Sequence, residues 1–61
     1  MNMKELRMKA NLTQAQLAEK LGVTQTCVGK WETAGVLPRA SMINSILEVL
    51  NCTYDDLFRK E

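Results

Sequence analysis

The chain has 61 residues, of which 46% are hydrophobic and 25% are charged, and its formal net charge is +1. A chain of this length and composition has room for one ordinary globular domain, so we expect a single domain over residues 1–61. No apolar run reaches the roughly 20 residues that a membrane-spanning helix needs, and the first residues lack the apolar core of a signal peptide. We therefore expect a cytoplasmic protein with no membrane partner.

The residue types that carry chemistry are scarce. The chain has no histidine and only two cysteines, Cys27 and Cys52, too few for a disulfide framework or a four-ligand zinc site. It also lacks a glycine-rich phosphate loop and a pair of carboxylates facing a pocket. We expect two free thiols, no metal, no other cofactor and no small-molecule ligand. The protein is not predicted to be an enzyme.

The charges are unevenly distributed. Residues 1–39 carry six basic and three acidic side chains, whereas residues 40–61 carry two basic and four acidic ones. A basic N-terminal part suits a nucleic-acid partner, but so small a difference also arises by chance.

The first predicted helix covers residues 2–10, which are mostly good helix formers. Its apolar positions are Met3, Leu6, Met8 and Ala10. Asn11 ends it, because asparagine tolerates a positive φ. Thr13 and Gln16 have the spacing of a capping box, so a second helix begins at about Gln14.

Residues 14–31 predict two short helices that meet at a sharp turn. Gly22 lies just past the end of the first of them, where a positive φ is usually needed. Thr24 can cap the next helix, which we expect to end at about Glu32, with Val28 and Trp31 on its apolar face. This is the layout of a helix-turn-helix.

Two further helices complete the prediction. Pro38 precedes a helix over residues 39–50 whose apolar stripe is typical of a core. Asn51 is its expected C-cap. Thr53 and Asp56 form a second capping box, which opens a short helix over residues 54–59. No segment alternates like a strand, so we predict a compact all-α domain of five helices.

The run LTQAQLAEKLGVTQTCVGKWE, the following LP pair and the ending LNCTYDDLF resemble the phage repressor and Cro group of helix-turn-helix regulators. The resemblance extends from about residue 4 to residue 58. It implies a lambda-repressor-like fold of the xenobiotic response element type, with double-stranded DNA as the partner and the helix after Thr24 in the major groove.

The residues on that helix that face away from its apolar stripe are then the candidates for reading bases. They are Gln25, Thr26, Gly29 and Lys30. A glutamine amide can donate to and accept from adenine, so Gln25 is the first of them. Gly29 lowers helix stability, and either close approach to DNA or neutral drift at an exposed site explains its presence.

The resemblance also assigns positioning residues. Gln14 matches a glutamine that contacts phosphate in the family, and Thr24, Thr33 and Arg39 are further phosphate candidates. Taken alone, Gln14 and Gln25 are also ordinary solvated polar residues at the N-terminus of a helix. Arg7 and Glu32 match an ion pair that joins the first and third helices.

We therefore expect a sequence-specific transcriptional regulator, and specifically a repressor that binds a palindromic operator as a homodimer. Candidate dimer contacts are Val36, Leu37, Tyr54 and Phe58. The alternative hypothesis is a protein-binding module, antitoxin-like or anti-repressor, whose main partner is another protein.

Overall fold

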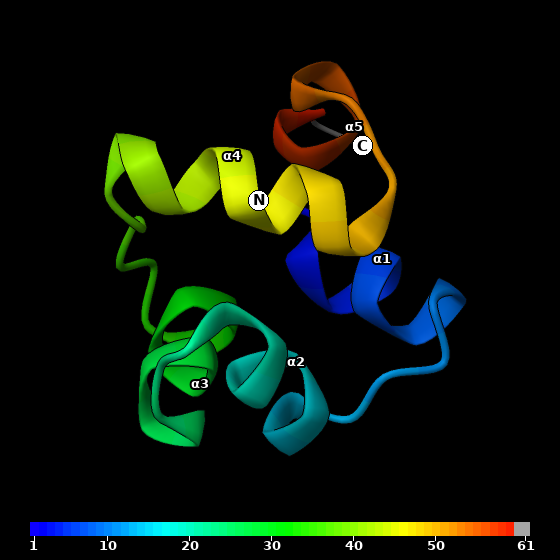
Figure 1. The fold of residues 1–61 in the computed structure, drawn as a ribbon. Helices are drawn as coiled ribbons and strands as arrows, with labels where there is room; N and C mark the ends of the chain where they lie inside the picture. Colours follow the sequence, from blue (N-terminus) through cyan, green and yellow to red (C-terminus); the bar gives the residue numbers. More distant parts are fainter. Residues whose placement is uncertain (60–61) are drawn as a thin grey trace.

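The computed structural model describes residues 1–59, which form five helices and contain no strand (Figure 1). The helices are α1 (Met3–Lys9), α2 (Gln14–Leu21), α3 (Gln25–Thr33), α4 (Ala40–Leu50) and α5 (Tyr54–Phe58). The predicted all-α fold of five helices is confirmed. Within the described residues, no helix is long and apolar enough to cross a membrane.

One apolar core receives side chains from every helix. Its buried members are Met3, Leu17, Ala18, Val28, Ile46, Leu50 and Leu57. The predicted stripe of α4 contributes to it, and Trp31 packs against it from α3. Figure 1 shows α2 and α3 beneath α4, with α5 at the C-terminal end of α4. The core thus holds α3 against the rest of the molecule by one face only.

Three helices begin with the predicted threonine caps. The Thr13 hydroxyl accepts from the Gln16 amide at 3.1 Å, and the Gln16 side chain accepts from the Thr13 amide at 2.9 Å. Thr24 caps α3 with a single bond, in which its hydroxyl accepts from the Cys27 amide, and Thr53 with Asp56 forms a second capping box. These bonds satisfy amides that the first turn of a helix leaves without a partner, and so fix where each helix begins.

The predicted helix ends are also present. Gly22 has φ +74°, while Asn11 and Asn51 have φ +60° and +51°. Each turns the chain sharply after a helix, a conformation that glycine adopts without strain and asparagine tolerates. The turn at Gly22 is the corner between α2 and α3.

The structure corrects several details of the sequence prediction. Met8 is 59% exposed, because it lies about 140° around α1 from the buried Met3. Thr33, expected outside the third helix, is its last residue. The other boundaries move by one residue: α1 covers 3–9 instead of 2–10, α4 begins at 40, and α5 ends at 58.

The start of the chain is bonded to α5. The Asn2 backbone amide donates to the Leu57 carbonyl at 2.7 Å. The Asn2 side chain donates to the carbonyls of Asp56 and Arg59 at 3.1 and 2.9 Å. These three bonds satisfy carbonyl groups in and just after α5, and they hold that short helix beside α1, where Met3 and Leu57 are buried.

Candidate nucleic-acid interface

Helix α3 has one buried face and one exposed face. Val28 is fully buried, whereas Gln25, Thr26 and Lys30 are exposed. Because residues three to four apart share a face of a helix, the three exposed side chains lie along the side of α3 that points away from the core. The structure therefore places three of the four base-reading candidates on one accessible surface.

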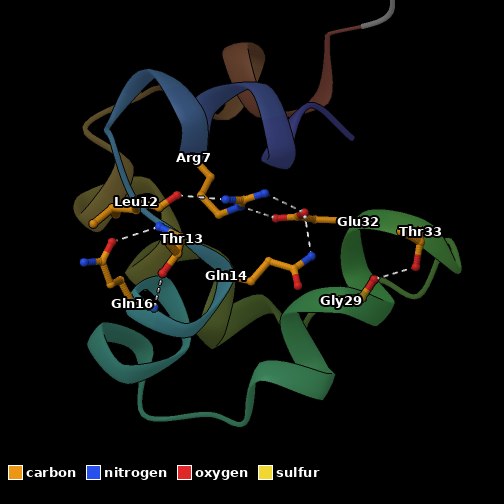
Figure 2. Close-up of polar contacts among 8 residues, drawn as sticks. All are labelled: Arg7, Leu12, Thr13, Gln14, Gln16, Gly29, Glu32 and Thr33. Carbon is orange, nitrogen blue, oxygen red and sulfur yellow. Dashed lines mark hydrogen bonds and ion pairs between the residues drawn. The ribbon is translucent and has the colours of Figure 1, made fainter.

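The fourth candidate, Gly29, differs in kind. It has no side chain, and its carbonyl oxygen accepts a hydrogen bond from the Thr33 hydroxyl at 2.7 Å (Figure 2). Gly29 therefore cannot read a base through a side-chain donor or acceptor. A Cβ added at Gly29 would have no neighbouring heavy atom within 4 Å, apart from those of adjacent residues and its own helix backbone. The position is an open space on the flank of α3.

Arg7 and Glu32 form a buried ion pair between α1 and the last turn of α3. The guanidinium Nε and Nη2 donate to the two carboxylate oxygens of Glu32 at 2.8 and 3.2 Å. The Glu32 side chain is 1% exposed and the Arg7 side chain 11%. Arg7 also donates from Nη1 to the Leu12 carbonyl at 2.8 Å, so the pair is connected to the segment that leads into α2.

Gln14 brings α2 into the same network. Its side-chain amide donates to Glu32 Oε1 at 3.0 Å (Figure 2). A carboxylate only accepts, so this bond fixes the Nε2 side of the Gln14 amide toward Glu32. One of the two Nε2 protons remains for another acceptor. Sequence reasoning predicted Gln14 only as a phosphate contact, and missed that it links α2 to α3.

The two threonine candidates for phosphate contact already form bonds within the protein. The Thr24 hydroxyl accepts from the Cys27 amide at 3.3 Å, which leaves its own proton free to donate. The Thr33 proton is donated to Gly29, so this hydroxyl must rotate before it can donate to a phosphate. Arg39 is exposed before α4 and forms no ion pair with any of residues 1–59.

The four dimer candidates form two separate groups. Val36 and Leu37 are 47% and 64% exposed on the loop between α3 and α4. Tyr54 is 56% exposed on α5, and its ring lies against that of the half-buried Phe58 with centroids 4.5 Å apart. The loop and α5 lie at opposite ends of α4 (Figure 1). Leu57 lies between the two aromatic residues in sequence but is fully buried.

Both cysteines are free thiols in the structure. Burial raises the pKa of the Cys52 thiol, and the nearby Asp56 carboxylate raises it further. Among residues 1–59, no group of three or more potential metal-ligating side chains is close enough to hold a metal ion.

A helix pair joined at Gly22, with its second helix exposed along one face, defines a helix-turn-helix domain. A model of the helix-turn-helix family matches residues 3–57. The chain belongs to this family, and within it to the Cro/C1 type.

A curated relative agrees with this membership. The HTH-type transcriptional activator BcrR of Enterococcus faecalis is 37% identical over 59 residues, which cover 97% of this chain and 29% of the relative. The chain thus spans less than a third of that relative's length.

Proposed function

We propose that the chain binds double-stranded DNA in a sequence-specific manner, as the DNA-binding domain of a transcriptional regulator. The main support is the exposed set Gln25, Thr26 and Lys30 on a helix whose opposite face is buried. The major groove of B-DNA is wide enough to admit an α-helix, and side chains on the outer face of that helix then reach the base edges.

The three side chains have different capacities. Gln25, in the first turn of α3, can pair with N6 and N7 of adenine at once, which is worth roughly 1 to 3 kcal/mol of discrimination. Thr26 offers a hydroxyl to a base or a methyl group to thymine. Lys30 can donate to guanine or to a phosphate. This set reads a short half-site.

In this proposal, contacts with the phosphates of the DNA backbone hold the exposed face of α3 against the bases. Gln14 retains one amide proton, Thr24 retains its hydroxyl proton, and Arg39 supplies a cation. Thr33 can donate to a phosphate only after its hydroxyl gives up the hydrogen bond to the Gly29 carbonyl. Few of these groups are charged, so we expect a shallow dependence of affinity on salt and weak binding to one half-site.

We propose that two copies bind a palindromic operator with half-sites about 34 Å apart, because a second copy compensates for weak half-site binding. The proposed contact is the exposed Tyr54 with the half-buried Phe58 against which its ring lies, since aromatic side chains are common anchors at interfaces. Sedimentation of the wild type and of Tyr54→Ala, with and without operator DNA, tests this. A wild type that stays monomeric on the operator contradicts the dimer.

We propose repression as the direction of regulation. A domain that occupies DNA blocks an overlapping promoter without further contacts, whereas activation requires an additional contact with the transcription machinery. The relative is named an activator. A reporter gene placed behind the selected operator separates the two, because reporter output falls under repression and rises under activation.

Selection of binding sites from random duplexes tests the proposed function itself. We expect an enriched sequence that binds roughly 10³-fold more tightly than random DNA at the same salt concentration. Equal affinity for all duplexes contradicts sequence-specific binding. Loss of function in Tyr54 and Phe58 variants, together with full function in Gln25→Ala, favours the protein-binding alternative instead.

A further inference from the structure

Gly29 occupies a position in α3 that the protein fold does not require to be glycine. Its φ is not positive, unlike that of Gly22 or Gly35. No heavy atom beyond its own helix backbone and adjacent residues lies within 4 Å of the place where a Cβ would be. Glycine nevertheless weakens a helix relative to alanine. Within the monomer, therefore, neither packing nor backbone conformation accounts for this residue.

Two polar residues, Glu32 and Thr33, follow Gly29 about one turn further along α3. Glu32, one turn further along α3, accepts from the side chain of Gln14 at the first residue of α2. Thr33, one turn beyond Gly29, donates its hydroxyl proton to the Gly29 carbonyl, and Figure 2 draws this bond as well as the bond from Gln14 to Glu32. The Gln14 amide that is bonded to Glu32 retains one unused proton, and the Thr33 hydroxyl is bonded to the carbonyl of Gly29 itself.

We propose that this open position, which we call the Gly29 notch, receives a phosphodiester group of the DNA backbone and lets α3 approach it closely. The inference rests on the proposed DNA binding and concerns how the helix is seated, not which bases it reads. The notch excludes a Cβ in the complex although the free protein accommodates one. Gly29 is therefore a positioning element of the interface. This proposal replaces the expectation from the sequence that Gly29 is one of the residues that read bases.

A backbone phosphate fits better than a base edge. Gly29 has no side-chain donor or acceptor, and its carbonyl already accepts from Thr33. The donors that the proposal pairs with Gly29 are the unused proton of the Gln14 amide, which is bonded to Glu32, and the ammonium of Lys30, the next residue of α3; both suit an anion. Phosphate contacts are made at every DNA sequence, so the notch contributes to affinity equally on specific and random duplexes.

The test compares Gly29→Ala with Asn44→Ala, a helix-favouring substitution at an exposed position of α4. Both variants are expected to be at least as stable as the wild type, and Gly29→Ala is expected to melt about 4 to 8 °C higher. In fluorescence anisotropy, Gly29→Ala is expected to lose about tenfold in affinity on the selected duplex and a similar factor on a random one. Asn44→Ala is expected to bind like the wild type.

The outcomes separate this inference from the function on which it rests. If the wild type binds DNA and Gly29→Ala binds equally well or better, the proposed role of the Gly29 notch is wrong, while the proposal that the chain binds DNA is retained. If Gly29→Ala loses affinity only for the selected duplex, Gly29 lies next to a base, and the proposal that it lies against a phosphate is wrong. If the wild type binds no duplex, both proposals fail.

Discussion

Glu32 accepts both hydrogen bonds of a buried, two-point ion pair from Arg7, at 2.8 and 3.2 Å, and the same carboxylate accepts a third from Gln14. One side chain therefore connects α1, α2 and α3. Because it lies in the last turn of α3, it fixes the orientation of the exposed face of that helix relative to the rest of the domain.

Replacing Glu32 with glutamine is expected to destabilise the fold severely. The change leaves the Arg7 guanidinium buried without a counter-charge, and breaking such a pair costs about 3 to 5 kcal/mol. A domain of this size has a total stability of similar magnitude. Urea denaturation is expected to show loss of most of the free energy of unfolding.

Two further variants test the cause of that loss. Glu19→Gln removes an exposed carboxylate from α2 and is expected to change the free energy of unfolding by less than about 0.5 kcal/mol. The double variant Arg7→Met with Glu32→Leu is expected to recover at least half of the loss, because no charge then remains buried. A single Glu32→Gln variant as stable as Glu19→Gln would show that the pair carries no such energy.

Gly22→Ala is expected to destabilise the fold by about 1 kcal/mol. The residue has φ +74°, and an L-residue with a Cβ is strained there even where space is free. Thermal denaturation should show a fall of about 4 to 8 °C. Gly29→Ala, which lies in a regular helix, provides a matched control, because its melting temperature is expected to rise. A rise in melting temperature for both variants would contradict the role given to the turn.

The features that residue spacing alone predicted correctly are local ones, whereas the Arg7–Glu32 pair, which joins residues 25 positions apart, was expected from the family resemblance. The capping box of Thr13 and Gln16 and the positive φ at Gly22 depend on residues within one turn of each other, so spacing alone identifies them. The bonds of Asn2 to α5 and of Gln14 to Glu32 join residues 54 and 18 positions apart. They depend on how helices are oriented in space, which no single-sequence pattern contains.

The features of the candidate site also fall into those that the sequence predicted and those that it could not. Helical periodicity predicted the exposure of Gln25, Thr26 and Lys30 and the burial of Val28. Periodicity gave no sign that the Thr33 hydroxyl is occupied by a bond to Gly29, or that the flank at Gly29 is open. Those two facts depend on side-chain rotamers and on the position of α2.

The Asp56 carboxylate should make stability depend on acid pH. Hydrogen bonds from the Thr53 backbone and then its side chain lower the pKa of Asp56, and the Arg59 guanidinium at 3.3 Å contributes to the same effect. A lowered pKa in the folded state gives stability that is present in full above the unfolded pKa of about 4. That stability is lost as the pH falls through the lowered pKa.

Asp56→Asn is therefore expected to be less stable than the wild type at pH 7, and the difference is expected to shrink steadily as the pH falls below about 4. Urea midpoints measured across this range provide the comparison. Asp55→Asn removes the same charge one residue earlier without touching the capping box, and serves as the control. A difference between Asp56→Asn and the wild type that stays constant down to pH 2 would exclude the carboxylate as its source.

The claim that α3 reads DNA sequence through its exposed side chains is tested most directly at Gln25. The measurement is the affinity of the wild type and of Gln25→Ala for the selected duplex and for a series in which each base pair is changed singly. We expect the wild type to lose about 5- to 150-fold when the base pair read by Gln25 is changed. Gln25→Ala should bind that changed duplex and the original equally, while it still discriminates at every other position and unfolds like the wild type. A Gln25→Ala variant that keeps the full wild-type pattern of discrimination would contradict the account.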